Sequence, residues 1–169
     1  MSITLSAKAS FICEYLKNLG IDFTVILHEA AETLEKCAEI EKIIGGKICK
    51  NLFLQTTTGN AYYLLLMNSK KKFVTKEVSK ALGSSRLSFA SGEKMEEMLG
   101  TSPGSLSITS LVFDKEKKVS LAIDSDVLKE EYICCHPCDC TATLKIKTTD
   151  ATDILVPSLG ITPIIIDII

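Results

Sequence analysis

The stretch from Lys47 to Met67 reads KICKNLFLQTTTGNAYYLLLM. Its two apolar runs, 47–55 and 61–67, have the length and composition of β-strands. The polar loop between them contains Gly59 and Asn60, residue types that suit a tight turn between antiparallel strands. This segment therefore predicts a β-hairpin.

Helical and strand patterns extend on both sides of this hairpin. Helical spacing of apolar residues, with N-cap and glycine stop signals, predicts helices over 7–19, 34–44, 75–82 and 92–99, and short helical pieces near 125–128 and 149–155. Further strands are predicted over 21–27, 86–89, 108–113, 119–123, 132–135, 141–146 and 161–168. Because no regular strand–helix–strand alternation appears, we expect an α+β fold: a mixed, mostly antiparallel sheet with packed helices, not a doubly wound parallel sheet.

Length and composition predict one domain over residues 1–169. A chain of 169 residues buries roughly 70% of the surface that its unfolded form exposes, and 46% of these residues are hydrophobic. The formal net charge of −2 provides no strong positive field, which argues against a DNA-coating protein. No uncharged apolar run approaches ~18 residues, and the first residues show no secretory pattern. We therefore expect a cytoplasmic protein with neither membrane nor DNA as a partner.

Seven cysteines, four of them within 134–140, raise the question of a metal or redox site. An odd number fits reduced thiols better than a disulfide framework. A structural zinc site draws paired ligands from two separated segments, and this cluster has no second pair in the sequence. We therefore expect no metal and no cofactor. A thiol-based metal or redox protein remains an alternative, built on Cys134, Cys135, Cys138 and Cys140.

Lys50 is the first candidate for chemistry. Alternate residues of a strand share a face, which places Lys50 with Ile48, Leu52 and Leu54. An ammonium among aliphatic side chains either extends to water at the strand edge or takes an anionic partner, such as a phosphate or a developing oxyanion. The pattern leaves both interpretations open and marks a candidate pocket.

Two further segments combine polar groups with backbone freedom. The loop 100–104 reads GTSPG, and its glycines permit close approach of the backbone to a ligand, although the same residues form ordinary helix ends and turns. His136 ends a predicted strand and precedes the hydroxyl of Thr141, so both could line a cleft; a structural histidine is the default interpretation. Lysines gather at 70–72, at 115–118 and at 145–147, either as solvated surface or as contacts for a few phosphates.

The motifs of several enzyme classes are missing from the sequence. It contains no Gly-x-x-x-x-Gly-Lys loop, no Gly-x-Ser-x-Gly elbow and no His-Glu-x-x-His pair. Nucleotide hydrolysis, serine hydrolase chemistry and zinc-dependent proteolysis therefore lose their main support.

Five segments taken in order carry a family resemblance: His28, KNLFL at 50–54, RLSFAS at 86–91, GTSPGS at 100–105, and His136-Pro137 followed by TAT at 141–143. Together they resemble the YbaK-type aminoacyl-tRNA deacylase family, related to the editing insertion domain of bacterial prolyl-tRNA synthetase. The resemblance covers nearly the whole chain. KNLFL and LSFAS are most similar to the prolyl-tRNA deacylase (PrdX or ProX) branch, so a prolyl-tRNA editing domain fold is implied.

The resemblance also implies an activity and partners. The activity is hydrolysis of the ester that joins a wrong amino acid to the terminal adenosine of tRNA(Pro), with Ala-tRNA(Pro) as the expected substrate. The partners are the acceptor end of mischarged tRNA(Pro) and prolyl-tRNA synthetase, and no cofactor is implied. The catalytic residues carried over are Lys50, Gly100 and Gly104, and the substrate-binding residues are His28, Asn51, Ser88, Pro103, His136 and Thr141.

One residue departs from the family pattern, because Cys140 stands where relatives carry asparagine. The expected chemistry needs few groups, since an aminoacyl ester requires little beyond orientation, a water and a place for negative charge. We expect Lys50 and the N–H groups of loop 100–104 to hold the carbonyl and the terminal nucleotide while water attacks. A non-catalytic module that binds tRNA or a synthetase is the other alternative.

Overall fold

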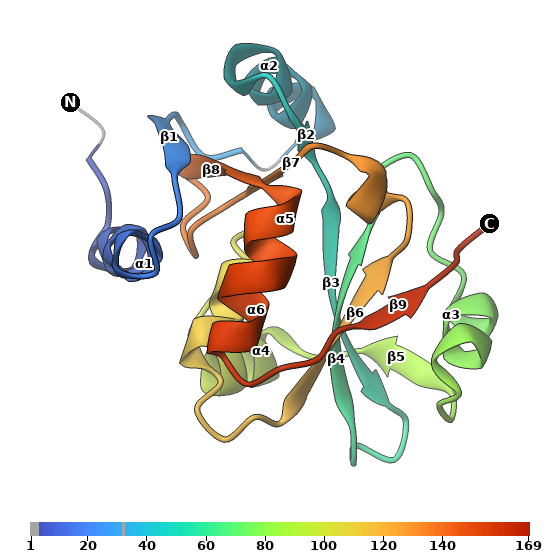
Figure 1. The fold of residues 1–169 in the computed structure, drawn as a ribbon. Helices are drawn as coiled ribbons and strands as arrows, with labels where there is room; N and C mark the ends of the chain where they lie inside the picture. The colour runs from blue at the N-terminus through green and yellow to red at the C-terminus, as the bar shows by residue number, and fades with distance from the viewer. Residues whose placement is uncertain (1–3, 32) are drawn as a thin grey trace.

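The computed structural model describes residues 4–31 and 33–169 (Figure 1). Within this part of the chain the strands form two sheets instead of the single sheet expected. The first sheet has the order β1-β8-β7-β2 and contains β1 (Phe23–Leu27), β2 (Lys47–Ile48), β7 (Tyr132–Cys135) and β8 (Ala142–Lys147). The second has the order β5-β3-β4-β6-β9 and contains β3 (Lys50–Thr56), β4 (Tyr62–Met67), β5 (Leu87–Phe89), β6 (Val119–Asp124) and β9 (Ile164–Ile166).

Both sheets are mixed, which confirms the α+β class. The predicted hairpin is present as the antiparallel pair β3–β4, and β3–β5, β1–β8 and β7–β8 are also antiparallel. The pairs β2–β7, β4–β6 and β6–β9 are parallel. The predicted strand 47–55 is interrupted at Cys49, where the chain passes from the first sheet into the second.

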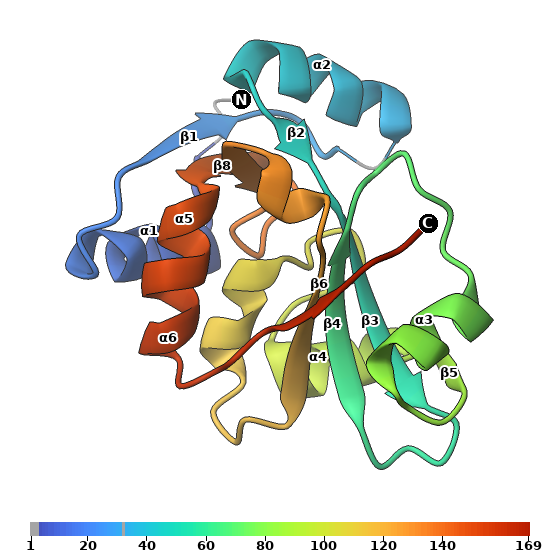
Figure 2. The same cartoon turned by 45° about the vertical axis from the view of Figure 1, so that its right-hand side comes forward.

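Helices pack on both sheets. They are α1 (Ala7–Asn18), α2 (Leu34–Ile44), α3 (Thr75–Leu82), α4 (Gly92–Leu99), and a helix near the C-terminus that comprises α5 (Thr148–Asp150), the π-helical turn η3 (Ala151–Leu155) and α6 (Val156–Ser158). Helix α2 lies beside the first sheet at β2 (Figure 2). Figure 2 also shows α3 on one side of the second sheet and α4, α5 and α6 on the other. No helix in the described residues is long and apolar enough to cross a membrane.

The period-two alternation of β3 and β4 divides the core between the two faces of the second sheet. Phe53, Leu64 and Leu66 point into the main core, which α1, α4 and the C-terminal helix share. Leu54 and Met67 point into a second cluster, which Val78 of α3 closes.

One predicted strand is wrong: residues 108–113 form the 3-10 helix η1 (Ile108–Phe113). The Ser107 hydroxyl accepts a hydrogen bond from the N–H of Thr109, and the Ser110 hydroxyl accepts one from the N–H of Ser107. This capping box satisfies the backbone locally, so the segment forms a helical turn despite its strand-like composition. The predicted 125–128 piece is the short 3-10 helix η2 (Val127–Lys129), and the predicted strand 161–168 is ordered as a strand only over 164–166.

Candidate functional site

Two histidines from distant segments meet at the end of the β1–β8 ladder. Leu27 pairs with Ala142, and the His28 N–H donates to the Thr141 carbonyl at 2.9 Å, so the backbone of His28 lies opposite Thr141. The His28 ring reaches diagonally along the ladder, and its Nε2 lies 2.8 Å from the Thr143 hydroxyl. The ring centroids of His28 and His136 are 6.0 Å apart. We call His28, His136 and Thr143 the histidine cluster.

The hydrogen bonds of the histidine cluster indicate which ring nitrogen of each histidine carries a proton. His28 Nδ1 lies 2.6 Å from the Glu29 carbonyl, and His136 Nδ1 lies 2.7 Å from the Ala142 carbonyl. A carbonyl oxygen only accepts, so we place a proton on both Nδ1 atoms. Burial lowers the pKa of His136 and favours its neutral ring, although the bond to Ala142 acts in the opposite direction. The Nε2 atom of His136 therefore carries a lone pair that can accept a hydrogen bond or a proton.

Hydroxyl groups from the segment after the glycine loop fix the backbone of His136. The Ser107 and Thr109 hydroxyls donate to the His136 carbonyl at 2.6 and 3.3 Å, and all three residues are buried. Ser107 and Thr109 were not among the predicted site residues, because the segment that carries Thr109 was assigned to a strand. Their Ser-x-Thr spacing at the start of a turn was the available signal.

The loop 100–104 begins where α4 ends. Gly100 adopts φ 63°, donates its N–H to the Glu96 carbonyl at 3.0 Å, and accepts a hydrogen bond from Lys8 Nζ at its own carbonyl. The polar backbone groups of Gly100 therefore serve the fold. In the described chain, the N–H groups of Thr101, Ser102 and Gly104 donate no hydrogen bond to another backbone group. Thr101 is buried, whereas Ser102 and Gly104 are exposed, so the latter two are the residues of this loop whose N–H groups are open to a ligand.

Thr101 adds an unusual polar group to the loop. Its side chain is 1% exposed, and among the described residues its hydroxyl has no hydrogen-bond partner. Buried hydroxyls are nearly always paired, and an unpaired one costs about 1–3 kcal/mol. Because it is shielded from solvent, this hydroxyl is a cost to the fold and not an open binding group.

Lys50 lies on the face of β3 that was predicted from the alternation. It stands opposite Met67, on the side of the second cluster, and is half-buried instead of extending into bulk solvent. Its Nζ donates a hydrogen bond to the Lys71 carbonyl, in the turn that follows β4. The ammonium thus contacts the turn after β4 and not the glycine loop, which lies on the main-core side of the sheet with Leu99 and Leu106.

The remaining predicted residues occupy separate places. The side chain of Asn51 donates to the Cys49 carbonyl at 3.1 Å, and Ser88 is paired with Gln55 at the sheet edge. Pro103 packs against Gly92, where an added Cβ would be 3.3 Å from its Cγ. The Thr141 hydroxyl donates to Asp139 at 2.7 Å and closes the β7–β8 turn. Thr143, two residues further along the strand, contacts His28 in its place.

Four cysteines offer protonated thiols rather than thiolates. Burial raises the pKa of Cys49 to about 12 and that of Cys134 to about 11, and it also raises the pKa values of Cys135 and Cys138. Metal binding and nucleophilic attack both use the thiolate. Over residues 4–31 and 33–169, no group of three His, Cys, Asp or Glu side chains is arranged to hold a metal ion. The metal or redox alternative therefore gains no support from the structure.

Comparisons with known proteins agree with this architecture. The model of the aminoacyl-tRNA editing domain family matches residues 28–154. The chain is 28% identical over 151 residues to "Prolyl-tRNA editing protein ProX" of Acetoanaerobium sticklandii, which covers 89% of this chain and 92% of that protein. It is also 28% identical over 139 residues to "Prolyl-tRNA synthetase associated domain-containing protein 1" of Danio rerio, with 81% and 75% covered.

A solved structure confirms the expected fold. The crystal structure of a candidate trans-editing enzyme for prolyl-tRNA synthetase superposes with a TM-score of 0.73 at 18% identity, over 98% of this chain and 99% of that one. The family model spans Lys50, the glycine loop and the histidine cluster. On this match, the chain belongs to the aminoacyl-tRNA editing domain family, as its sequence resemblance predicts.

Proposed function

We propose that this protein is a trans-editing aminoacyl-tRNA deacylase that hydrolyses the ester of mischarged tRNA(Pro), with Ala-tRNA(Pro) as its preferred substrate. The observation that carries the proposal is the family match over 28–154, which includes every residue assigned to the site. The names of the similar proteins from Acetoanaerobium sticklandii and Danio rerio support the connection to prolyl-tRNA.

In this proposal Lys50 holds the ester, and the glycine loop, on the main-core side of the sheet, contacts a different part of the substrate. A lysine ammonium has three N–H bonds, and the bond to the Lys71 carbonyl uses one of them. The other two can bind an oxygen that becomes negative as water attacks the carbonyl. The free N–H groups of Ser102 and Gly104 are assigned to that second part of the substrate and not to the carbonyl at Lys50.

The histidine cluster has a supporting part. His136 is neutral and its Nε2 is unprotonated, so it can accept a hydrogen bond from the attacking water or from a ribose hydroxyl. The hydroxyls of Ser107 and Thr109 hold the His136 backbone in place. No side-chain nucleophile is needed, because the ester is already activated.

Preference for alanine follows from size. A pocket distinguishes near-isosteric apolar side chains by only about 1–3 kcal/mol, so a synthetase for a small amino acid needs a second sieve. A site too narrow for the pyrrolidine ring of proline admits alanine and leaves correctly charged tRNA(Pro) intact.

A panel of charged tRNAs tests the proposal. Wild-type protein is incubated with Ala-tRNA(Pro), Cys-tRNA(Pro), Pro-tRNA(Pro) and Ala-tRNA(Ala), and release of the amino acid is followed over time. We expect fastest hydrolysis of Ala-tRNA(Pro) and none of Pro-tRNA(Pro). Faster hydrolysis of Cys-tRNA(Pro) would overturn the choice of substrate. Binding of tRNA without hydrolysis of any ester would favour a non-catalytic module instead.

Lys50→Ala tests the assigned role in the same assay. One well-placed donor to an oxyanion is worth about 2.7–4 kcal/mol, so the rate falls about a hundredfold or more. Lys115→Ala, a change of the same type at an exposed lysine outside the site, is the matched control. Full activity of a folded Lys50→Ala variant would remove Lys50 from the mechanism.

A further inference from the structure

The segment from Lys70 to Arg86 is strongly basic, although the whole protein carries a net charge of −2. It contains six basic residues and one acidic residue, Glu77. Lys71 is neutralised by ion pairs with Asp124 at 2.8 Å and Asp126 at 2.9 Å. The other five basic residues are exposed: Lys70, Lys72, Lys76, Lys80 and Arg86. We call these five the α3 basic face.

The cations of the α3 basic face form no ion pairs with the residues that the structure describes, although Glu77 lies on the same helix. In the described part of the chain, none of its five cations lies within 4.0 Å of a carboxylate. Lys76 and Lys80 stand four residues apart on α3 and therefore share one side of the helix. Lys76 and Arg86 also line one surface hollow, together with Thr75 and Ser79. Lys76, Lys80 and Arg86 thus lie close together on this part of the surface.

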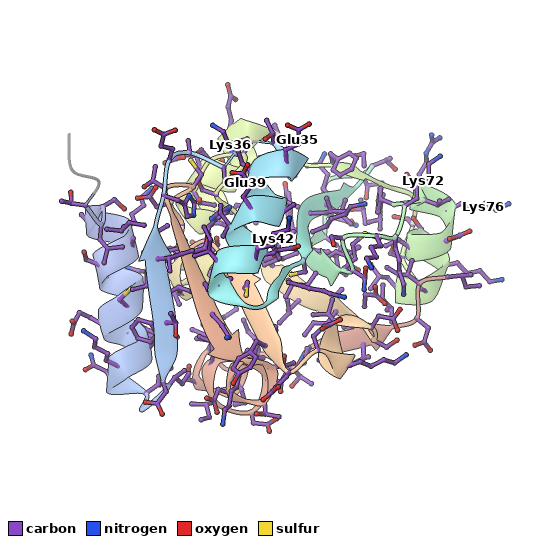
Figure 3. All side chains as sticks on the ribbon, turned by 90° about the horizontal axis from the view of Figure 1, so that it is seen from above. Glu35, Lys36, Glu39, Lys42, Lys72 and Lys76 are labelled. Carbon is purple, nitrogen blue, oxygen red and sulfur yellow. The ribbon has the colours of Figure 1, made fainter. Side chains whose placement is uncertain are left out.

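Other lysines of the protein stand among acids. On α2, Lys36 and Lys42 alternate with Glu35 and Glu39, whereas Lys72 and Lys76 extend outward beside α3 (Figure 3). Lys115 and Lys118 line a hollow that also contains Glu97, Asp114 and Glu116, and Lys118 is ion-paired with Glu116. Within the described residues, a polyanion therefore meets cations without ion-pair partners at α3, and mixed charge at α2 and at the hollow that Lys115 and Lys118 line.

An exposed aromatic ring adjoins the same face. Phe89 lies on β5, three residues after Arg86, and is 59% exposed. It packs against Phe73, with ring centroids 5.2 Å apart. Basic side chains beside an exposed aromatic ring are typical of surfaces that bind single-stranded RNA, in which phosphates meet the cations and an unpaired base stacks on the ring.

The α3 basic face is also continuous with the proposed site. Lys50 Nζ donates to the carbonyl of Lys71, and the neighbours of Lys71 in the chain are Lys70 and Lys72. An RNA strand held by Lys70 and Lys72 thus passes next to Lys50. Both the charge and the position of the face fit one occupant.

We infer that the α3 basic face and Phe89 form the surface that binds the tRNA acceptor end, with the cations on backbone phosphates and Phe89 stacked on an unpaired base near the 3′ end. This inference rests on the proposed function, because that function defines the RNA and the end that must reach Lys50.

The test is equilibrium binding of uncharged tRNA(Pro) over a range of salt concentrations, with wild-type protein and with Lys72→Ala/Lys76→Ala. We expect the double variant to bind roughly tenfold to a hundredfold more weakly near 0.1 M salt, and its slope of log K against log salt to be smaller by about two. The matched control, Lys115→Ala/Lys118→Ala, should bind within twofold of wild type. Equal losses in both double variants would overturn the inference.

Phe89→Leu tests the aromatic part, because it keeps an apolar side chain and removes the ring. Loss of one stacked base weakens binding roughly fivefold to a hundredfold. We expect this loss with complete tRNA and not with tRNA that lacks its unpaired 3′ nucleotides. The same loss with both RNAs would exclude stacking. Vesicles with 20% phosphatidylserine serve as an alternative polyanion, and binding of vesicles in preference to tRNA would refute the RNA surface.

The binding test also separates the inference from the function it rests on. If the wild type hydrolyses mischarged tRNA and the α3 variants bind and react normally, the inference fails and the proposed function stands. If tRNA binding depends on α3 but no ester is hydrolysed, the proposed function fails and the surface stands. An aminoacyl-adenosine ester, which has no backbone phosphates, should react equally with wild type and with Lys72→Ala/Lys76→Ala.

Discussion

Loss of the Asp124 carboxylate should lower the stability of this protein by a mechanism that can be tested. It is fully buried, and its carboxylate accepts hydrogen bonds from Lys71 Nζ at 2.8 Å and from the N–H of Asn68 at 3.1 Å. Lys71 Nζ also donates to the Ile168 carbonyl, so this ion pair joins the turn after β4 to the last residues of the chain. Asp124→Asn keeps the shape of the side chain and removes its charge.

The expected cost comes from the charge that remains. Removing one partner of a buried ion pair typically costs 3–5 kcal/mol, because the other charge is left buried without compensation. Here Lys71 is 16% exposed and keeps Asp126 as a partner, and an asparagine oxygen still accepts one hydrogen bond. We therefore expect a cost of about 2–3 kcal/mol, which corresponds to a fall in Tm of roughly 4–12 °C for a chain of this size.

Thermal unfolding followed by circular dichroism measures the effect, with Asp126→Asn as the matched control. Asp126 bonds the same lysine but is 34% exposed, so its loss should lower Tm much less. Lys71→Met and the double variant Lys71→Met/Asp124→Leu complete a mutant cycle. Replacing both charges by apolar groups should restore much of the stability lost in either single variant. Equal Tm values for Asp124→Asn and Asp126→Asn would refute the reasoning.

Three smaller predictions follow from individual residues. Thr101→Val removes a buried hydroxyl without a partner, so Tm should stay constant or rise, and a lower Tm would show that the hydroxyl is bonded. Burial lowers the pKa of His136 below its ordinary value near 6.5, so its contribution to stability should be complete above about pH 6.5 and decline as the pH falls below it. The free energy of unfolding, measured with urea from pH 7.5 to 5, should show this decline. His136→Asn should make the decline smaller. A Cβ at Gly46 would lie 2.5 Å from Cys134 Sγ, so Gly46→Ala should lower the free energy of unfolding by about 1–3 kcal/mol, as measured by chemical denaturation. The double variant Gly46→Ala/Cys134→Ala should recover part of this loss.

Local signals in the sequence were sufficient for the helices that begin and end at caps. Helix α2 starts after Thr33, whose hydroxyl accepts a hydrogen bond from the N–H of Lys36, and α3 ends at Gly83 in the left-handed region. These contacts join residues a few positions apart, so the sequence contains all the information that they need. The same holds for α4, which the Ser91 side chain caps.

Pairings between distant segments could not be predicted in this way. The parallel pairing of Ile48 with Cys134 creates the first sheet and interrupts the strand 47–55, yet no pattern near either residue specifies it. The contact of His28 with Thr143 depends on the register of β1 and β8. The sequence analysis selected Thr141, and the register does place Thr141 opposite His28, but the ring of His28 reaches Thr143, a side-chain orientation that the sequence does not reveal.

The face of Lys50 was predicted correctly, but its surroundings depend on two segments that the alternation of β3 does not reveal. Lys50 on β3 and Lys71 in the turn after β4 lie close together but have different partners. The ammonium of Lys71 is bound by two carboxylates, whereas the ammonium of Lys50 is bound by the neutral Lys71 carbonyl. In the described chain no carboxylate lies within 4.0 Å of Lys50. A carboxylate there would compete with a negatively charged oxygen of the substrate, whereas a carbonyl orients the ammonium and leaves its charge uncompensated. The buried Asp124–Lys71 pair thus holds the carbonyl that orients Lys50, and it does so without neutralising the charge that the proposed chemistry requires.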